Sequence, residues 1–435
     1  MQEAEITIGG ISVRDLAEQY GTPLYAYDAE RIRENFRRLT RALRGNYPEV
    51  SVFYAIKACN NLEIAKLLVD EGSGVDAASP NEIRLAQALG LSGERIIYTG
   101  NSLSDEDLAA GLRAGVNFNV DDHGILKRLF SIGKPRCMSF RINPSGEDIA
   151  TPDLKPFAGP SAKFGIHPRH VEEAYRTALE NGVERLGVHM MPHSQAHKPE
   201  NFAHVTGKLL DLIGPVARKL GFDLAFVDIG GGLGIPYRRE QPPLDVEAVA
   251  RGIAAMVRKK CAEHGLKEPR LVMEPGRYFV GDAGYVLGRV ISIKQGYKTI
   301  IGTDISMNTM ARPVMYGAYH EVRINGRGGQ TAPMAMTGQV CENTDMWIPE
   351  REFPADVAEG DVVVLMDAGA YGHVMSYDYN GRLRPAEVLI DGGKSRLIRR
   401  RDTFEDMVSR MCLSDDIKER LRAASGEPAG ATGCG

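Results

Sequence analysis

The sequence has few cysteines, and none lies close to another. The six occur at Cys59, Cys137, Cys261, Cys341, Cys412 and Cys434. Without a CxxC pair, neither a zinc ribbon nor a disulfide framework is indicated, so we expect a protein of the reducing cytoplasm. Residues 1–10 contain acidic side chains and lack the apolar core of a signal peptide, which agrees with that expectation.

No run of the sequence approaches the roughly 18 apolar residues that cross a membrane, so no membrane partner is expected. No basic excess favours nucleic acid either, because 53 Lys and Arg stand against 57 Asp and Glu, a net charge of -4. Apolar residues make up 43% and charged residues 25%, which excludes a disordered or fibrous chain. A chain of 435 residues predicts two domains, or one large barrel with an appendage.

Short apolar segments alternate with amphipathic helical stretches over residues 31–280. Residues 61–72 and 81–90 each place apolar side chains on one helix face and end at a glycine, and Ser104 is the expected N-cap of another helix. This alternation predicts a parallel sheet, and eight strands in about 250 residues predict an α/β fold with a closed (β/α)8 TIM-like barrel. An open doubly wound sheet is the alternative. The expected strands are residues 50–56, 74–78, 95–99, 117–121, 137–143, 186–191, 224–229 and 271–275.

The pattern changes after residue 280. Strand-like segments there are joined by turns rich in Gly, Asn and Pro, which predicts a C-terminal all-β domain over residues 281–413. Residues 1–30 could pair with either domain, and residues 414–435 are expected to form a short charged helix and a flexible tail. The expected strands are residues 285–295, 298–304, 319–325, 333–340, 361–367 and 386–391.

Reactive side chains of a parallel barrel gather at the carboxyl ends of its strands. The first expected strand ends at Lys57, the second near Asp76 and the sixth at His189, while the last two end in GGGLG (230–234) and EPGR (274–277). Each feature alone has an ordinary explanation, as a surface lysine, a turn or a loop ion pair. Together they place an anion-binding glycine loop beside a lysine and a carboxylate. This combination indicates pyridoxal phosphate, with Lys57 bonded to its aldehyde and Glu274 on its ring nitrogen.

Five ordered motifs resemble those of the fold-type III pyridoxal-phosphate decarboxylases, which share an alanine-racemase-like barrel. They are YAIKA (54–58), GGGLG (230–234), EPGR (274–277), CENTD (341–345) and DAGAY (367–371). Residues 161–166, 307–320 and 377–393 are most similar to the diaminopimelate decarboxylase family. The resemblance runs from about residue 10 to about residue 410. It implies a barrel with a β-domain that residues 1–30 join, and a head-to-tail homodimer in which Cys341 and Glu342 enter the partner's active site.

The resemblance also implies a role for each site residue. Lys57 would hold the cofactor and Cys341 would return a proton to the substrate carbon; we expect burial to lower the pKa of Lys57 and keep it nucleophilic. The substrate would be meso-diaminopimelate, converted to L-lysine and carbon dioxide. The expected cofactor contacts, besides Lys57, are Asp76, His189, Ser194, Gly231, Gly232, Glu274, Gly276, Arg277 and Tyr371. The expected substrate contacts are Arg277, Arg312, Tyr316, Glu342 and Tyr371.

One loop departs from the family pattern H-x-H-x-G-S. The chain reads HMMPHS from His189, so Met191 stands where the family has a histidine that stacks on the cofactor, and His193 replaces a glycine. Either Met191 packs on the ring through its sulfur, or the loop is remodelled and His193 reaches the ring. This departure leaves two alternatives open: a decarboxylase of another amino acid in a specialised pathway, and a catalytically silent regulator on the same fold.

Two further alternatives are disfavoured by particular residues. An amino-acid racemase on this scaffold would carry an arginine at the pyridine nitrogen, where this chain has Glu274. A metal-dependent hydrolase would need a ligand cluster. His189, His193 and His197 recur every four residues, but Pro192 interrupts any helix that would align them, so no metal is expected.

Overall fold

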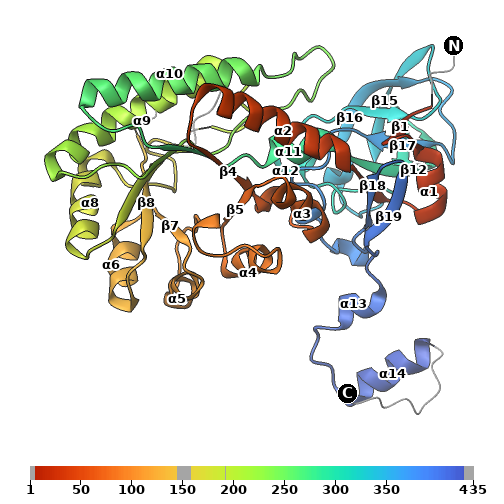
Figure 1. The fold of residues 1–435 in the computed structure, drawn as a ribbon. Coiled ribbons are helices and arrows are strands. Elements are labelled where there is room, and N and C mark those ends of the chain that lie inside the picture. Colours follow the sequence, from red (N-terminus) through yellow and green to blue (C-terminus); the bar gives the residue numbers. More distant parts are fainter. Residues whose placement is uncertain (1–4, 145–157, 192, 426–435) are drawn as a thin grey trace.

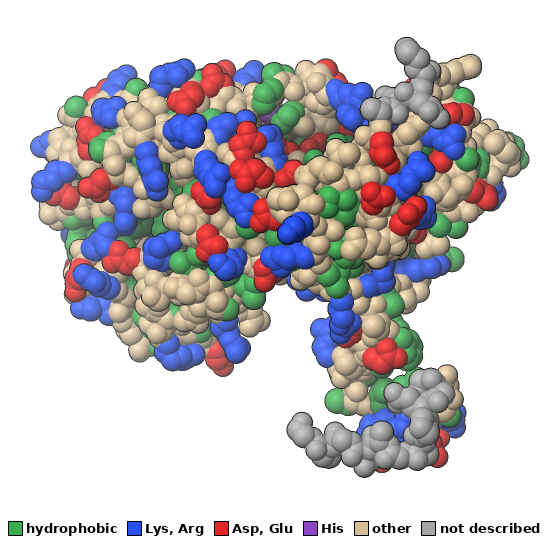
Figure 2. All heavy atoms as spheres, turned by 45° about the vertical axis from the view of Figure 1, so that its right-hand side comes forward, with side chains coloured by type: hydrophobic (Ala, Val, Ile, Leu, Met, Phe, Trp, Pro, Cys, Tyr) green, Lys and Arg blue, Asp and Glu red, His purple; other side chains and the backbone are tan. Residues whose placement is uncertain are grey.

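The computed structural model describes residues 5–144, 158–191 and 193–425. Figure 1 shows a barrel ringed by helices, a β-sheet domain beside it, and a C-terminal arm with two helices that stands away from both. Figure 2 shows the same arm from another side, and shows acidic and basic side chains mixed over the visible face of both bodies. No helix among the described residues is long and apolar enough to cross a membrane.

The barrel is closed and parallel, which confirms the predicted fold class and excludes an open sheet. Each of the eight expected strands is present at its expected place. The strand order β10-β11-β4-β5-β6-β7-β8-β9 closes through the parallel pairing of β9 with β10. The strands are β4 (Val50–Ala55), β5 (Gly74–Ala77), β6 (Ile96–Tyr98), β7 (Asn117–Val120), β8 (Cys137–Arg141), β9 (Arg185–His189), β10 (Phe226–Asp228) and β11 (Arg270–Met273).

Local capping explains where the barrel helices begin. The Asp28 side chain accepts from the N–H groups of Glu30 and Arg31 at the start of α2, and Ser104 forms the predicted N-cap of α5 in a capping box with Asp107. Each helix buries an apolar face against the strands. The helices are α2 (Ala29–Asn46), α3 (Leu62–Asp70), α4 (Pro80–Ala88), α5 (Asp105–Ala114), α6 (His123–Ile132), α8 (Val171–Glu180), α9 (Pro199–Leu220) and α10 (Val246–His264).

The second body is a 9-stranded sheet in which β16-β15-β13-β12-β3-β18-β19 form the main path, and β14 and β17 pair off it. The six strands expected after residue 280 are present, while β16 and β19 were not predicted. The strands are β3 (Leu24–Asp28), β12 (Gly284–Gln295), β13 (Thr299–Thr303), β14 (Val322–Ile324), β15 (Thr331–Thr337), β16 (Ile348–Pro354), β17 (Val362–Leu365), β18 (Ala386–Asp391) and β19 (Lys394–Arg399).

The N-terminal segment lies in this sheet. Its strand β3 pairs antiparallel with β12 and parallel with β18. A hairpin of β1 (Thr7–Ile8) and β2 (Ile11–Ser12) precedes it, followed by the helix α1 (Val13–Tyr20). Both pack against the sheet through one apolar cluster that they share with its strands. On these contacts we propose the division into residues 1–30 with 281–413, 31–280, and 414–435. The arm contains α13 (Phe404–Val408) and α14 (Asp415–Ser425), so the expected charged helix is present, whereas the tail over 426–435 lies outside the described residues.

Candidate active site

A single pocket at the carboxyl ends of the barrel strands gathers nine of the predicted site residues. It is lined by Lys57, His189, Ser194, Gly231, Gly232, Glu274, Gly276, Arg277 and Tyr371, together with Ala55, Thr99, Arg141, Met191 and Leu233. Asp76 contacts the pocket through Lys57. Neither Thr99 nor Arg141 was predicted as a site residue, although each lies at or just beyond the end of an expected strand.

Lys57 follows β4 directly, in the short 3-10 helix over Ile56–Ala58. Its Nζ donates to Oδ2 of the buried Asp76 at 2.8 Å, and 47% of its side chain is exposed. Burial opposes the charge, but the negative potential of Asp76, Tyr371 and Glu274 outweighs it and raises the pKa of Lys57. The expectation of a lowered pKa was therefore wrong, because it considered burial without the carboxylates that share the rim.

Glu274 follows β11 and offers one carboxylate oxygen to the pocket. Its Oε2 lies 3.2 Å from Nε2 of His189, while its buried Oε1 has no hydrogen-bond partner among the described residues. Burial opposes ionisation, but His189, Lys57 and Asp228 lower the pKa of Glu274. An ionised acceptor without a donor fits the protonated nitrogen of a pyridine ring, so the residues present fit the cofactor that the sequence indicates.

The glycine-rich loop between β10 and α10 leaves no room for side chains. A Cβ on Gly231 would lie 2.4 Å from the carbonyl oxygen of Glu274, and Gly232 has φ of +85°, where L-residues are strained. Both glycines and Ser194 line the pocket. Close approach of backbone N–H groups and a hydroxyl is the chemistry that a phosphate group requires.

Met191 lines the pocket, and His193 is buried without being one of the described lining residues. The Gly231 N–H points at Sδ of Met191 at 3.2 Å, so the thioether packs directly on the glycine loop. Met191 rather than His193 therefore lines the pocket, while its place at the cofactor's face stays a prediction. Pro192, on which the argument against a metal-binding helix depended, lies outside the described residues.

Two arginines meet at one tyrosine beside the pocket. Nη1 of Arg312 on α12 (Arg312–Tyr316) donates to the Tyr237 hydroxyl at 3.0 Å, and Nη1 of Arg277 on α11 (Arg277–Val280) donates to the same oxygen at 2.5 Å. Neither guanidinium forms an ion pair within the described part of the chain, and Arg312 is only 7% exposed. Two guanidinium groups held together without an anionic partner provide the charge that an anion site needs. Tyr237 was missed; its only signal was its position directly after GGGLGIP.

His320, which accepts a hydrogen bond from Arg312, predicts a pH dependence of stability. Burial and, to a smaller extent, the charge of Arg312 lower the pKa of His320 to about 3. At acidic pH above that value, this side chain is therefore protonated in the unfolded chain but neutral in the folded protein. Stability should therefore rise with pH up to about 6.5, the ordinary pKa of histidine. We expect the urea unfolding free energy to be about 2 kcal/mol lower at pH 5 than at pH 7 because of His320. His320→Gln should show a shallower slope; an unchanged slope would contradict this assignment.

The structure does not bring Cys341, Glu342 and Tyr316 to the pocket of their own chain. Cys341 is exposed and its N–H donates to Oδ1 of Asn380, while Glu342 accepts from the Tyr379 hydroxyl. Tyr316 is 64% exposed at the end of α12. The predicted roles of Cys341 and Glu342 stay predictions that require a second copy of the chain, and the predicted substrate contact of Tyr316 stays a prediction.

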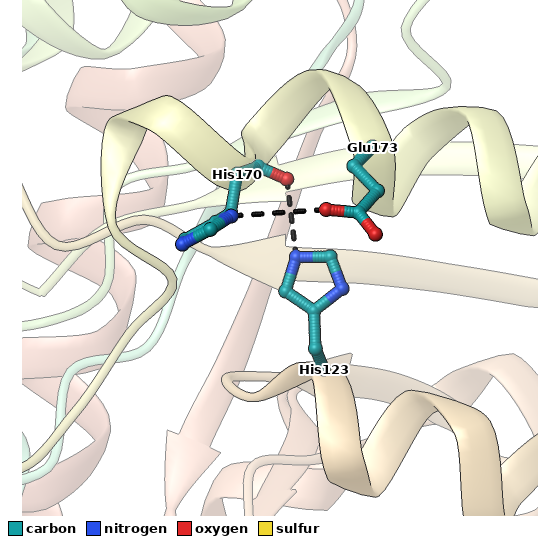
Figure 3. Close-up of side chains that lie close together, drawn as sticks. All are labelled: His123, His170 and Glu173. Atoms are coloured by element: carbon teal, nitrogen blue, oxygen red, sulfur yellow. Dashed lines mark hydrogen bonds and ion pairs between the residues drawn. The ribbon is translucent and has the colours of Figure 1, made fainter.

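Two groups of described residues come close enough to ligate a metal ion. One, formed by His189, Asp228 and Glu274, belongs to the pocket already described. Figure 3 shows the other, in which His170 Nδ1 lies 3.7 Å from Glu173 and the His123 ring reaches the His170 carbonyl. We assign it no metal, because Arg169 donates to the other ring nitrogen of His170.

The barrel and its pocket define a pyridoxal-phosphate enzyme, and comparison with known proteins agrees. Residues 30–281 match the family model described as pyridoxal-dependent decarboxylase, pyridoxal binding domain. The chain is 42% identical over 414 residues to the diaminopimelate decarboxylase of Methanothermobacter thermautotrophicus, covering 93% of this chain and 95% of that one. It is 34% identical to protein TabA of Pseudomonas amygdali pv. tabaci, covering 90% and 91%.

Solved structures agree with the sequence relatives. The crystal structure of the M. jannaschii diaminopimelate decarboxylase in co-complex with L-lysine superposes with a TM-score of 0.88 at 31% identity, covering 96% of this chain and 98% of that chain. The chain belongs to the pyridoxal-phosphate-dependent decarboxylases, in the diaminopimelate decarboxylase family. The predicted enzyme class and the predicted cofactor are thereby confirmed.

Proposed function

We propose that the protein decarboxylates meso-diaminopimelate to L-lysine and carbon dioxide, as a cytoplasmic homodimer with shared active sites. The observation that supports this choice of substrate is the pair of guanidinium groups, from Arg277 and Arg312, at Tyr237. A substrate that ends in an amino-acid group presents a second carboxylate, and a planar guanidinium binds carboxylates in a bidentate manner. The names of the M. thermautotrophicus and M. jannaschii relatives support the same choice.

The cofactor would be held at three points. Lys57 would bond to its aldehyde carbon, with Asp76 accepting from Nζ until the bond forms. Gly231 and Gly232, with Ser194 and Gly276, would surround the phosphate group, and the Gly231 N–H would exchange Sδ of Met191 for a phosphate oxygen. Oε1 of Glu274 would accept the ring N–H, and His189 fixes that carboxylate through Oε2.

Bound pyridoxal phosphate supplies a ring that takes up the electron pair of a breaking C–C bond. The negative charge of Glu274 would keep the ring nitrogen protonated, which would make the ring a better electron acceptor. The α-carboxylate would leave as carbon dioxide, and the proton that replaces it on the carbon would come from the Cys341 thiol of a second copy of the chain. Water would then reprotonate the thiolate.

The distal end of the substrate would bind outside the ring. Its carboxylate would lie at Arg277 and Arg312, with Tyr316 and Tyr371 beside it. Its ammonium would lie at Glu342 of the second copy. The Arg277 guanidinium lies 4.9 Å from the centre of the Tyr371 ring, so these two expected substrate contacts already touch each other within one chain.

A second candidate is a decarboxylase of another amino acid in a specialised pathway. The observation that favours it is Met191, which lines the pocket and stands in the sequence where the family has a histidine that stacks on the cofactor. The likeness to protein TabA, whose name is not that of a diaminopimelate decarboxylase, agrees with such a departure.

Carbon dioxide release from a panel of amino acids tests the proposal. We expect release from meso-diaminopimelate with a kcat/KM roughly a hundredfold or more above that for L-lysine and L-ornithine, which lack the second carboxylate. The L,L- and D,D-isomers serve as matched stereochemical controls. Faster release from another amino acid would select the second candidate, and release from none would indicate a silent regulator.

A further inference from the structure

The Tyr237 hydroxyl is the only described group that contacts both arginines through a hydrogen bond. The residue is 8% exposed, and both Arg277 and Arg312 donate to it. A tyrosine hydroxyl has two acceptor lone pairs and one donor hydrogen, so two guanidinium groups use its whole accepting capacity. Its own hydrogen has no acceptor among the described residues and remains available to an anion placed between the arginines.

His320 holds Arg312 from the opposite side. Its Nδ1 lies 2.9 Å from the carbonyl oxygen of Met366, which requires the hydrogen on Nδ1 and leaves Nε2 as an acceptor. Nη1 of Arg312 lies 2.7 Å from that Nε2. Both hydrogens of Nη1 are therefore used, one on His320 and one on Tyr237. The Nε and Nη2 groups of Arg312 donate to no described residue and are free for a ligand.

The same three side chains are packed as well as hydrogen-bonded. The rings of Tyr237 and His320 meet edge to face, with centroids 5.1 Å apart. The Arg312 guanidinium lies 4.9 Å from the Tyr237 ring centre and that of Arg277 lies 5.7 Å from it. The positive charges of Arg277 and Arg312 repel each other. In the absence of an anion, the Tyr237 hydroxyl therefore holds the two guanidinium groups together as their shared neutral acceptor.

We propose that Tyr237, supported by His320, is a positioning residue that makes the enzyme selective for ligands with a carboxylate at the distal end. The inference rests on the proposed function, because it assigns that carboxylate to Arg277 and Arg312. Without the hydroxyl, the guanidinium groups lose their common acceptor and their alignment. A ligand with the distal carboxylate should lose affinity, while a ligand without it should not.

The test compares L-lysine, which as the reaction product would place its one carboxylate at the distal site, with 1,5-diaminopentane, which has no carboxylate. Their dissociation constants are measured on the cofactor-loaded wild type and on Tyr237→Phe, by calorimetry and by the visible absorbance of the cofactor. We expect Tyr237→Phe to weaken L-lysine about tenfold or more, the loss typical of a hydrogen bond to a charged group. Binding of 1,5-diaminopentane should change by less than about twofold.

Two further variants separate positioning from general damage. Tyr278→Phe is the matched control, because the buried Tyr278 hydroxyl also accepts from an arginine, Arg38, at 2.8 Å; it should leave both dissociation constants unchanged. His320→Gln should weaken L-lysine selectively, but less than Tyr237→Phe. Equal weakening of both ligands by Tyr237→Phe, or no weakening, would overturn this inference alone. A wild type that binds both ligands equally would overturn the distal carboxylate site, and the inference with it.

Discussion

Lys57→Ala should eliminate both covalent cofactor binding and decarboxylation. The variant lacks the amine that bonds to the cofactor's aldehyde, so we expect kcat to fall by roughly a thousandfold or more, as when a covalent nucleophile is removed. Sodium borohydride, which makes a lysine–cofactor bond permanent, should fix the cofactor to the wild type on the peptide that contains Lys57. Mass spectrometry and the visible absorbance of the purified protein measure this binding without measuring activity.

Lys66→Ala is the matched control for this experiment. Lys66 lies on the neighbouring helix α3, where it is exposed and pairs with Asp70. Its removal should leave colour, labelling and turnover unchanged. Labelling of the wild type at another lysine, or an active Lys57→Ala variant, would contradict the assignment of Lys57.

Cys341→Ala should lower turnover by about 10²- to 10⁴-fold, the range for loss of a general acid, while the protein keeps its cofactor. The expected split between catalysis and cofactor binding follows from the structure, because Cys341 is exposed and lies outside the pocket of its own chain. Cys412→Ala is the control, since Cys412 is also exposed. Equal loss of cofactor and turnover in Cys341→Ala would indicate a packing role instead.

Mixing the two inactive variants tests whether the site is shared between subunits. A dimer of one Lys57→Ala chain and one Cys341→Ala chain contains one site with both residues intact and one site with neither. Random exchange should therefore restore about a quarter of the wild-type activity. Mixtures that exchange subunits and stay inactive would show that each chain supplies its own cysteine.

The barrel was predictable because its strands are buried on both faces and read as continuous apolar segments between helices with clear caps. The missed strands β16 and β19 lie at the ends of the main path of the second sheet. Both contain charged and exposed residues, as in REF and KSR. A strand at the edge of a sheet pairs through its backbone with one neighbour and needs no alternation of apolar residues, so its sequence does not show the usual strand pattern.

The pocket was predictable to the extent that its residues end consecutive strands. Lys57, His189 and Glu274 were found in this way, because position along a parallel strand determines which rim a side chain reaches. Tyr237 was not found, since it lies in a loop where no periodicity applies. The direction of the Lys57 pKa shift also could not be derived, because it depends on how close Asp76 and Glu274 come, which strand ends alone do not determine.

The place of β3 in the second sheet has a consequence for how the protein is made. The strand ends at Asp28, but its neighbours begin at Gly284 and Ala386. While the polypeptide emerges from the ribosome, β3 waits with both hydrogen-bonding edges open until the whole barrel has been translated, and the edge that pairs with β18 stays open longest. A nascent chain released prematurely, with its barrel complete, would still expose that strand to aggregation and to proteases.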